Sequence, residues 1–163
     1  AETWANIINC VFYAYNKIKN DRKNSEISEM KKFKTTLIDC LNSEILFSVF
    51  QMNKILNKMG LSYRQLMNEN NLYHEYTNVF SYYILKTMLL FNVEDFINWC
   101  SVHNINLIEF RKTDEKIRRF TEFVEDKYDG NKFLNFIDKI KNKTTNNAEL
   151  NQTLRMTIHD YGL

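Results

Sequence analysis

The 163-residue chain contains no proline and only three glycines, Gly60, Gly130 and Gly162. All-β folds and Rossmann-type nucleotide-binding folds rely on glycine and proline for their turns and phosphate loops. The scarcity of both residues argues against these classes. It predicts helices that are joined by turns of Asn, Asp and Ser.

Excess charge and long apolar runs are also scarce. The 22 Lys and Arg residues nearly balance the 20 Asp and Glu residues, which leaves a net charge of +2. A net charge this small does not attract the whole chain to nucleic acid or to anionic membranes. The longest apolar stretch is interrupted by Ser81, Lys86 and Thr87. We therefore predict no membrane span and no signal peptide.

Cysteine is present in an odd number, and the three residues lie far apart at Cys10, Cys40 and Cys100. Each stands beside apolar helix positions, so we expect buried free thiols, which favours a reducing compartment such as the cytoplasm. The histidines are His74, His103 and His159. Zinc sites usually draw two pairs of ligands with the members of a pair two to five residues apart, and among these residues only Cys100 and His103 have that spacing. The sequence therefore predicts no metal and no cofactor.

One pair of residues could support covalent chemistry. Cys100 and His103 lie one helical turn apart and could act as a nucleophile and its base. A core thiol beside a half-buried imidazole explains the same spacing. Since no other catalytic constellation is present, we predict no catalytic residue and no enzymatic activity.

The composition is that of one globular domain spanning residues 1–163, with 44% hydrophobic and 26% charged residues. Asn, Lys, Ile, Phe and Tyr are abundant and have AT-rich codons. Their abundance favours an AT-rich genome, such as that of a parasite or a large DNA virus.

Hydrophobic spacing predicts an all-α fold, a single compact bundle of six to eight helices around a buried central helix at about residues 72–91. Ser25 and Ser43 are expected to begin two successive helices, and Gly60 is expected to end the second in the left-handed conformation. Ser62 and Gln65 have capping-box spacing for a short helix. In the first helix, the inward residues are expected to be Trp4, Ile7, Ile8, Val11, Tyr15 and Ile18.

In the stretch 57–78, a glycine, a serine and an Asn-Asn pair stand where a helix-turn-helix would begin and end its helices. Leu66 and Leu72 stand where that motif has the apolar residues that hold its two helices together. Met67 is too bulky for the close crossing of two helices. The following helix would offer no basic side chain before Lys86. We therefore interpret this segment as a corner leading into the central helix, because DNA readout needs basic anchors.

Aromatic residues are in surplus, with twelve Phe, nine Tyr and two Trp. Such residues serve as anchors at protein interfaces. The leading hypothesis is a non-enzymatic regulator or adaptor that binds a protein partner, such as a helical segment, through aromatic and aliphatic side chains. The alternative for these residues is a well-filled aromatic core. The predicted partner-binding residues are Tyr63, Tyr73, Tyr76, Tyr82, Trp99 and Phe123, with Tyr13 as a further candidate.

Two other functions are kept open. A structural subunit of a larger assembly would use the same aromatic residues as permanent contacts. Nucleic acid could instead bind the basic segments 17–34 and 111–119, although interleaved Asp and Glu dilute both. The first basic segment contains Lys17, Lys19, Arg22, Lys23, Lys31, Lys32 and Lys34.

Overall fold

The computed structural model describes residues 1–19, 26–68, 79–141 and 147–161. These ranges form helices and loops and contain no strand, which confirms the predicted all-α bundle. The elements are α1 (Glu2–Lys19), α2 (Glu26–Lys58), α3 (Tyr63–Asn68), α4 (Val79–Phe91), α5 (Val93–His103), α6 (Asp114–Lys127), α7 (Asn131–Ile140), α8 (Ala148–Gln152) and the 3-10 helix η1 (Ile158–Tyr161).

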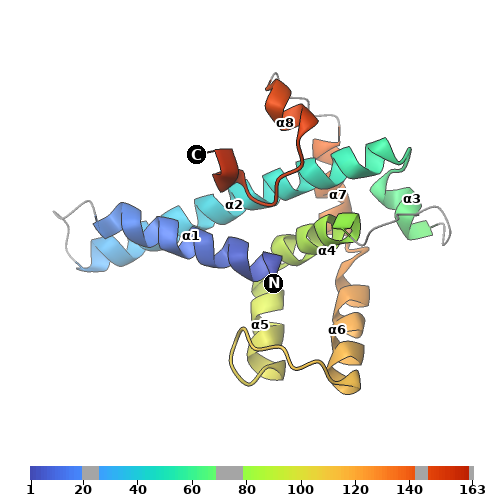
Figure 1. The fold of residues 1–163 in the computed structure, drawn as a ribbon. Coiled ribbons are helices and arrows are strands. Elements are labelled where there is room, and N and C mark those ends of the chain that lie inside the picture. Colours follow the sequence, from blue (N-terminus) through green and yellow to red (C-terminus); the bar gives the residue numbers. More distant parts are fainter. Residues whose placement is uncertain (20–25, 69–78, 142–146, 162–163) are drawn as a thin grey trace.

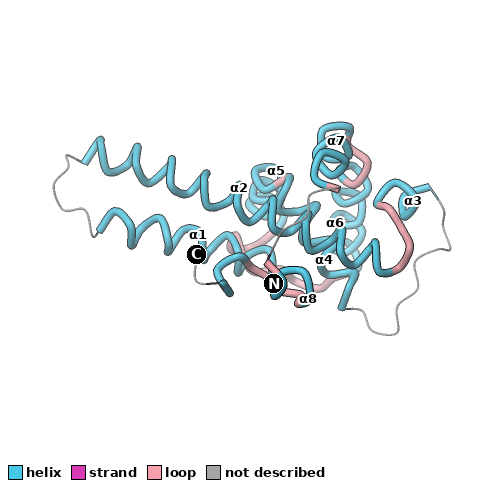
Figure 2. Tube along the Cα trace, turned by 90° about the horizontal axis from the view of Figure 1, so that it is seen from above, coloured by secondary structure: helices cyan, strands magenta, loops and turns pink. Residues whose placement is uncertain are grey.

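The long helix α2 is the spine of the fold, and it contacts α1, α4, α7 and η1. Helices α1 and α2 form a hairpin that projects from one side of the molecule (Figures 1 and 2). Helices α5 and α6 extend below the other helices in Figure 1 and lie next to each other there. The segment carrying α8 and η1 runs back along α2, and η1 lies against α2 within the hairpin.

Helix α2 is continuous over 33 residues, so the prediction that a new helix begins at Ser43 is wrong. The Ser43 hydroxyl donates to the carbonyl oxygen of Asp39, 3.0 Å away and one turn earlier. A serine bonded in this way satisfies its hydroxyl inside a helix without ending it. Cap-like residues alone therefore could not distinguish one long helix from two shorter ones.

The end of α2 follows the prediction. Gly60 has φ +71°, and its N–H donates to the carbonyl of Asn57 at 3.0 Å. The N–H of Leu61 donates to the carbonyl of Leu56 at 2.9 Å, which completes a Schellman motif. The capping box is also confirmed. The backbone N–H of Ser62 donates to Gln65 Oε1 at 2.9 Å, and the N–H of Gln65 donates to Ser62 Oγ at 3.3 Å.

The core lies between the second half of α2 and helix α4. Val49, Met52 and Leu56 of α2 meet Met88 and Leu90 of α4 in one buried cluster. The predicted central helix is observed as α4, whereas residues 72–78 of that prediction lie outside the described residues. No helix in the described ranges is both long enough and apolar enough to cross a membrane.

The corner predicted for residues 57–78 is described only as far as Asn68. Helix α3 packs against α7, where Arg64 forms an ion pair with Asp138 at 2.7 Å. The second half of the helix-turn-helix pattern, residues 69–78, lies outside the described residues.

Gly60→Ala is expected to lower the free energy of unfolding by about 1 kcal/mol, because a side chain at positive φ is strained. No atom lies within 4 Å of the Cβ that alanine would add, so the cost is conformational and not steric. Gly130→Ala is the matched control, since Gly130 has φ −55°. Urea denaturation measures both variants. Equal stability of the two variants would contradict the left-handed cap.

Candidate functional site

The face that α1 buries against α2 is made mainly of small and polar residues. Its buried residues are Thr3, Asn6, Ile7, Cys10 and Ala14. The short side chains allow the two helices to approach closely, as ridge-and-groove packing requires. Asn6 Nδ2 donates to Glu44 Oε2 at 2.8 Å across this interface. This buried hydrogen bond fixes the rotation of α1 about its own axis.

The prediction for α1 is only partly confirmed, because Ile7 is buried and Trp4 and Ile18 are half-buried, whereas the other predicted inward residues face outward. Ile8, Val11 and Tyr15 were expected in the core, and the structure exposes all three together with Phe12. These four residues recur at spacings of three and four, so they form one continuous strip along the helix. We call this strip the α1 stripe. An exposed stripe of this kind is typical of a surface that another molecule covers.

The stripe leads into an apolar groove of about 580 Å³ between α1, α4, α5 and the loop before α6. Ile8 belongs to both features, which makes them continuous. The main side chains of the groove come from regions far apart in the sequence, and they are Trp4, Ile8, Tyr82, Trp99, Phe110 and Phe120. Its volume is within the range of pockets that bury a ligand or several anchoring side chains.

An aromatic cluster holds the far wall of the groove in place. The Trp99 ring lies 5.2 Å from Phe120 and 6.0 Å from Phe123 between ring centroids. Phe110 lies 5.9 Å from Phe120, so the irregular loop before α6 joins the same cluster. Aromatic pairs at these separations add favourable energy beyond the burial of their area. Helices α5 and α6 are therefore joined through side chains.

Several polar residues interrupt the apolar lining, among them Asn104, Cys100 and Lys86. Asn104 Oδ1 is buried and has no hydrogen-bond partner within the described residues, whereas its Nδ2 donates to Leu107 O at 3.2 Å. Burial raises the pKa of the Cys100 thiol, although hydrogen bonds with Trp4 and Asn104 lower it in part. Burial lowers the pKa of Lys86 to about 8, against the opposing influence of Glu44, Asp160 and Glu2. An unpaired buried acceptor favours a ligand that brings a donor.

The predicted partner-binding residues have different positions. Tyr82 is exposed and, with the half-buried Trp99, lines the groove, whereas Phe123 is half-buried in the aromatic cluster behind it. Tyr63, predicted to bind a partner, is instead buried in the core, as the aromatic-core alternative expected. Its ring packs edge-on against Phe133 in the core, and its hydroxyl donates to Tyr128 O at 2.9 Å.

The other aromatic candidates lie elsewhere. Tyr73 and Tyr76 lie outside the described residues. Tyr13 is exposed on α1 away from the groove, where its ring is 5.6 Å from that of His159.

The two basic segments lie in different surroundings. Lys17, Lys19, Lys31 and Lys34 are exposed and Lys32 is half-buried, and all five lie near the end of the hairpin where α1 finishes and α2 begins. Arg22 and Lys23 lie outside the described residues. In the segment 111–119, Arg111 pairs with Glu109, Arg118 with Glu122 and Arg119 with Glu115. These ion pairs reduce the field that the second segment could present to phosphate groups.

The C-terminal segment is held on the bundle mainly by polar contacts. Lys54 Nζ donates to the carbonyls of Leu150 and Thr153, each at 2.5 Å, and Lys86 Nζ donates to that of Met156. Glu44 receives hydrogen bonds from Thr157 Oγ1 and, at 3.2 Å, from the backbone N–H of Ile158. Glu44 therefore accepts hydrogen bonds from both α1 and the C-terminal segment.

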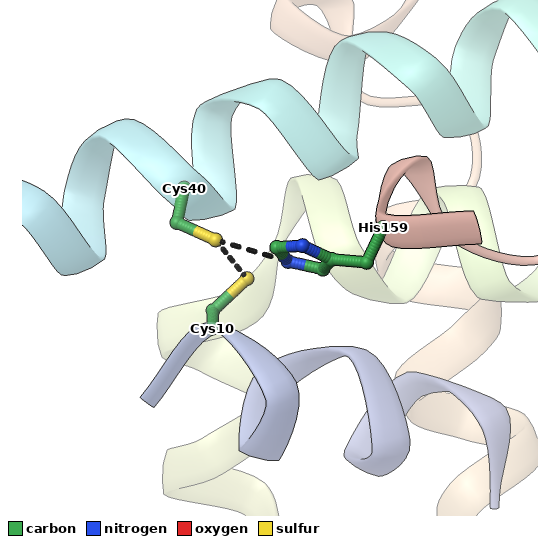
Figure 3. A group of neighbouring side chains, drawn as sticks. All are labelled: Cys10, Cys40 and His159. Atoms are coloured by element: carbon green, nitrogen blue, oxygen red, sulfur yellow. Dashed lines mark hydrogen bonds between the residues drawn. The ribbon is translucent and has the colours of Figure 1, made fainter. Parts of the chain in front are cut away.

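These contacts bring Cys10, Cys40 and His159 together from three elements (Figure 3). The Cys40 thiol donates to Cys10 Sγ at 2.9 Å, and His159 Nε2 lies 3.4 Å from Cys40 Sγ. Burial raises the pKa of both thiols. The sequence prediction missed this cluster because its members are separated by 30 and 119 positions. No local spacing signal exists for such a site.

No family model, curated protein or solved structure matches this chain significantly. Functional conclusions therefore rest on the geometry of the groove, the α1 stripe and the cysteine–histidine cluster.

The buried Lys86 predicts a specific dependence of stability on pH. The pKa of Lys86 is about 8 in the folded chain and 10.5 in the unfolded reference, so the unfolded state holds the proton longer. The contribution of Lys86 to stability should therefore rise as pH increases from 8 to 10.5. Below pH 8 both states are charged, so this contribution should be nearly constant.

Lys86→Met lacks the amine and should therefore lose this dependence of stability on pH. The other titratable groups are the same in both proteins, so their contributions cancel when the two free energies of unfolding are subtracted. The free energy of unfolding of the parent minus that of Lys86→Met should rise by about 3 kcal/mol over that interval. Urea denaturation at several pH values measures it. The control is Lys58→Met at an exposed position of α2. A difference that stays flat for Lys86→Met would show that this amine is not desolvated.

Proposed function

We propose that this protein is a non-enzymatic interaction domain that binds an amphipathic helix of a partner protein. The bound helix would lie along the α1 stripe and insert its largest side chains into the adjoining groove. The observation that supports this proposal most strongly is the outward rotation of α1, which exposes Ile8, Val11, Phe12 and Tyr15 together.

The dimensions favour a helix over a small molecule. A small ligand would fill the groove and leave the stripe in water. Ile8 and Tyr15 are seven positions apart, so the stripe extends about 10 Å along the helix axis beyond the groove. A partner helix with apolar residues at positions i, i+3, i+4 and i+7 matches such a stripe.

The groove also indicates the chemistry of the partner's anchors. Aromatic walls around Trp99 and Phe110 suit large aliphatic or aromatic side chains. Asn104 Oδ1 offers a buried acceptor, so an anchor with a donor, such as a tryptophan indole, should bind better than phenylalanine. Regulators and adaptors commonly recognise partners through helix-in-groove contacts of this kind.

Selection from a displayed library of amphipathic peptides about five turns long tests the proposal. The enriched peptides should become helical on binding. Phe12→Ala and Tyr82→Ala should each weaken their binding about tenfold or more, measured as Kd by fluorescence anisotropy. Phe12 is 60% exposed and Tyr82 50%, so neither truncation should unfold the chain.

Ile38→Ala is the matched control, because Ile38 is 57% exposed on α2 and lies outside the groove lining. It should leave peptide affinity unchanged. Two results would contradict the proposal. One is peptides that bind Phe12→Ala and Tyr82→Ala as tightly as the parent. The other is a parent chain that dimerises in light scattering while Phe12→Ala is monomeric, since the stripe would then be covered by a second copy.

A further inference from the structure

We infer that Cys10, Cys40 and His159 form a zinc site that ties the C-terminal segment to the α1–α2 hairpin. This site is independent of the proposed helix-binding groove, because Cys10 is on the buried face of α1 and the α1 stripe is on the exposed face.

The ligand types and their separations suit zinc. The candidate donor atoms of all three side chains lie within 4.8 Å of one another. Tetrahedral zinc bound to sulfur at about 2.3 Å and nitrogen at about 2.0 Å places those two ligands about 3.5 Å apart. The observed separation between Cys40 Sγ and His159 Nε2 is 3.4 Å. The two sulfurs, 2.9 Å apart, would need to separate by about 0.9 Å.

The electrostatic balance is also favourable. Two thiolates neutralise a zinc dication, and a neutral imidazole adds no charge, so the loaded cluster carries little net charge into a buried place. The carboxylate of Glu44 is fully buried, and its Oε1 lies 3.9 Å from His159 Nε2. Because the loaded cluster is nearly neutral, it can lie beside this carboxylate without adding charge to the core.

Neighbouring residues position His159, and a pocket beside the cluster gives an ion access to it. Glu44 accepts from the backbone N–H of Ile158, so it positions the residue next to His159. A pocket of about 280 Å³ is lined by Cys40 and His159, and it gives an ion a route to the cluster and room for water as a fourth ligand. The histidine is only 23% exposed. A disulfide between Cys10 and Cys40 would not account for the position of this imidazole, whose Nε2 lies 3.4 Å from Cys40 Sγ.

The binding test uses the full chain, purified with reductant, stripped of metal and then titrated with zinc and separately with cobalt(II). Elemental analysis after gel filtration should find one zinc per chain. The cobalt form should show thiolate-to-metal charge-transfer absorption and the intense visible bands of tetrahedral coordination. Excess zinc should raise Tm by about 5 °C or more, and a chelator should reverse the shift.

Cys10→Ser, Cys40→Ser and His159→Gln should each weaken zinc binding more than tenfold. Cys100→Ser is the matched control, since Cys100 is also a buried free cysteine but lies in the groove lining. Replacing a buried cysteine can unfold the chain. The parent's cobalt spectrum and His159→Gln, at a peripheral 3-10 helix, therefore provide tests that do not depend on those variants.

Three results would overturn the inference or a part of it. Absence of stoichiometric zinc together with three free thiols would identify the cluster as a thiol pair of the core. A single free thiol, titrated after purification and denaturation without reductant, would identify a disulfide between Cys10 and Cys40. A zinc-bound parent whose Tm does not respond to zinc would also contradict the tie between the C-terminal segment and the hairpin.

Discussion

The hydrogen bond from Asn6 to the buried carboxylate of Glu44 sets the rotation of α1, and the rest of the surface depends on that rotation. A hydrogen bond to a charged group contributes about 1.5–3 kcal/mol, and leaving a buried carboxylate without its donors costs more. Turning α1 to bury Ile8 and Phe12 would remove this donor from Glu44. It would also replace the small contacts of Cys10 and Ala14 with large ones against α2. The helix therefore buries its small face.

Each face of α1 then has a distinct role. The inner face brings Cys10 to Cys40, and Glu44 brings His159 to the same place through the backbone of η1. The outer face presents the α1 stripe, which ends at a groove whose far wall is stabilised by the aromatic contacts of Trp99. The proposed helix-binding surface and the inferred zinc site thus arise from one structural constraint but have no residue in common.

Local signals in the sequence predicted the parts of the fold that depend on neighbouring residues. Gly60 ends α2 as its backbone preference requires, and Ser62 and Gln65 cap α3 as their spacing indicates. The apolar pattern also identified α4 as a buried helix. Ser43 was misread because the same hydroxyl can cap a helix or bond within one.

The features that depend on distant residues could not be predicted in this way. Hydrophobic periodicity places an apolar stripe of α1 but does not say whether core or solvent covers it. Only the buried partner Glu44, 38 positions away, decides that question. The same limit applies to Tyr63, whose burial depends on Phe133, and to the meeting of Cys10 with His159.

The most direct test of this account is thiol labelling of α1 in the native chain, with a chelator present so that no metal protects sulfur. The parent's Cys10 is compared with a cysteine introduced by Phe12→Cys. The account predicts that the introduced thiol reacts at nearly the rate of an unfolded peptide, whereas Cys10 reacts only after denaturation. A reactive Cys10 and a protected residue 12 would show that α1 buries its apolar stripe, and that result would contradict the central claim.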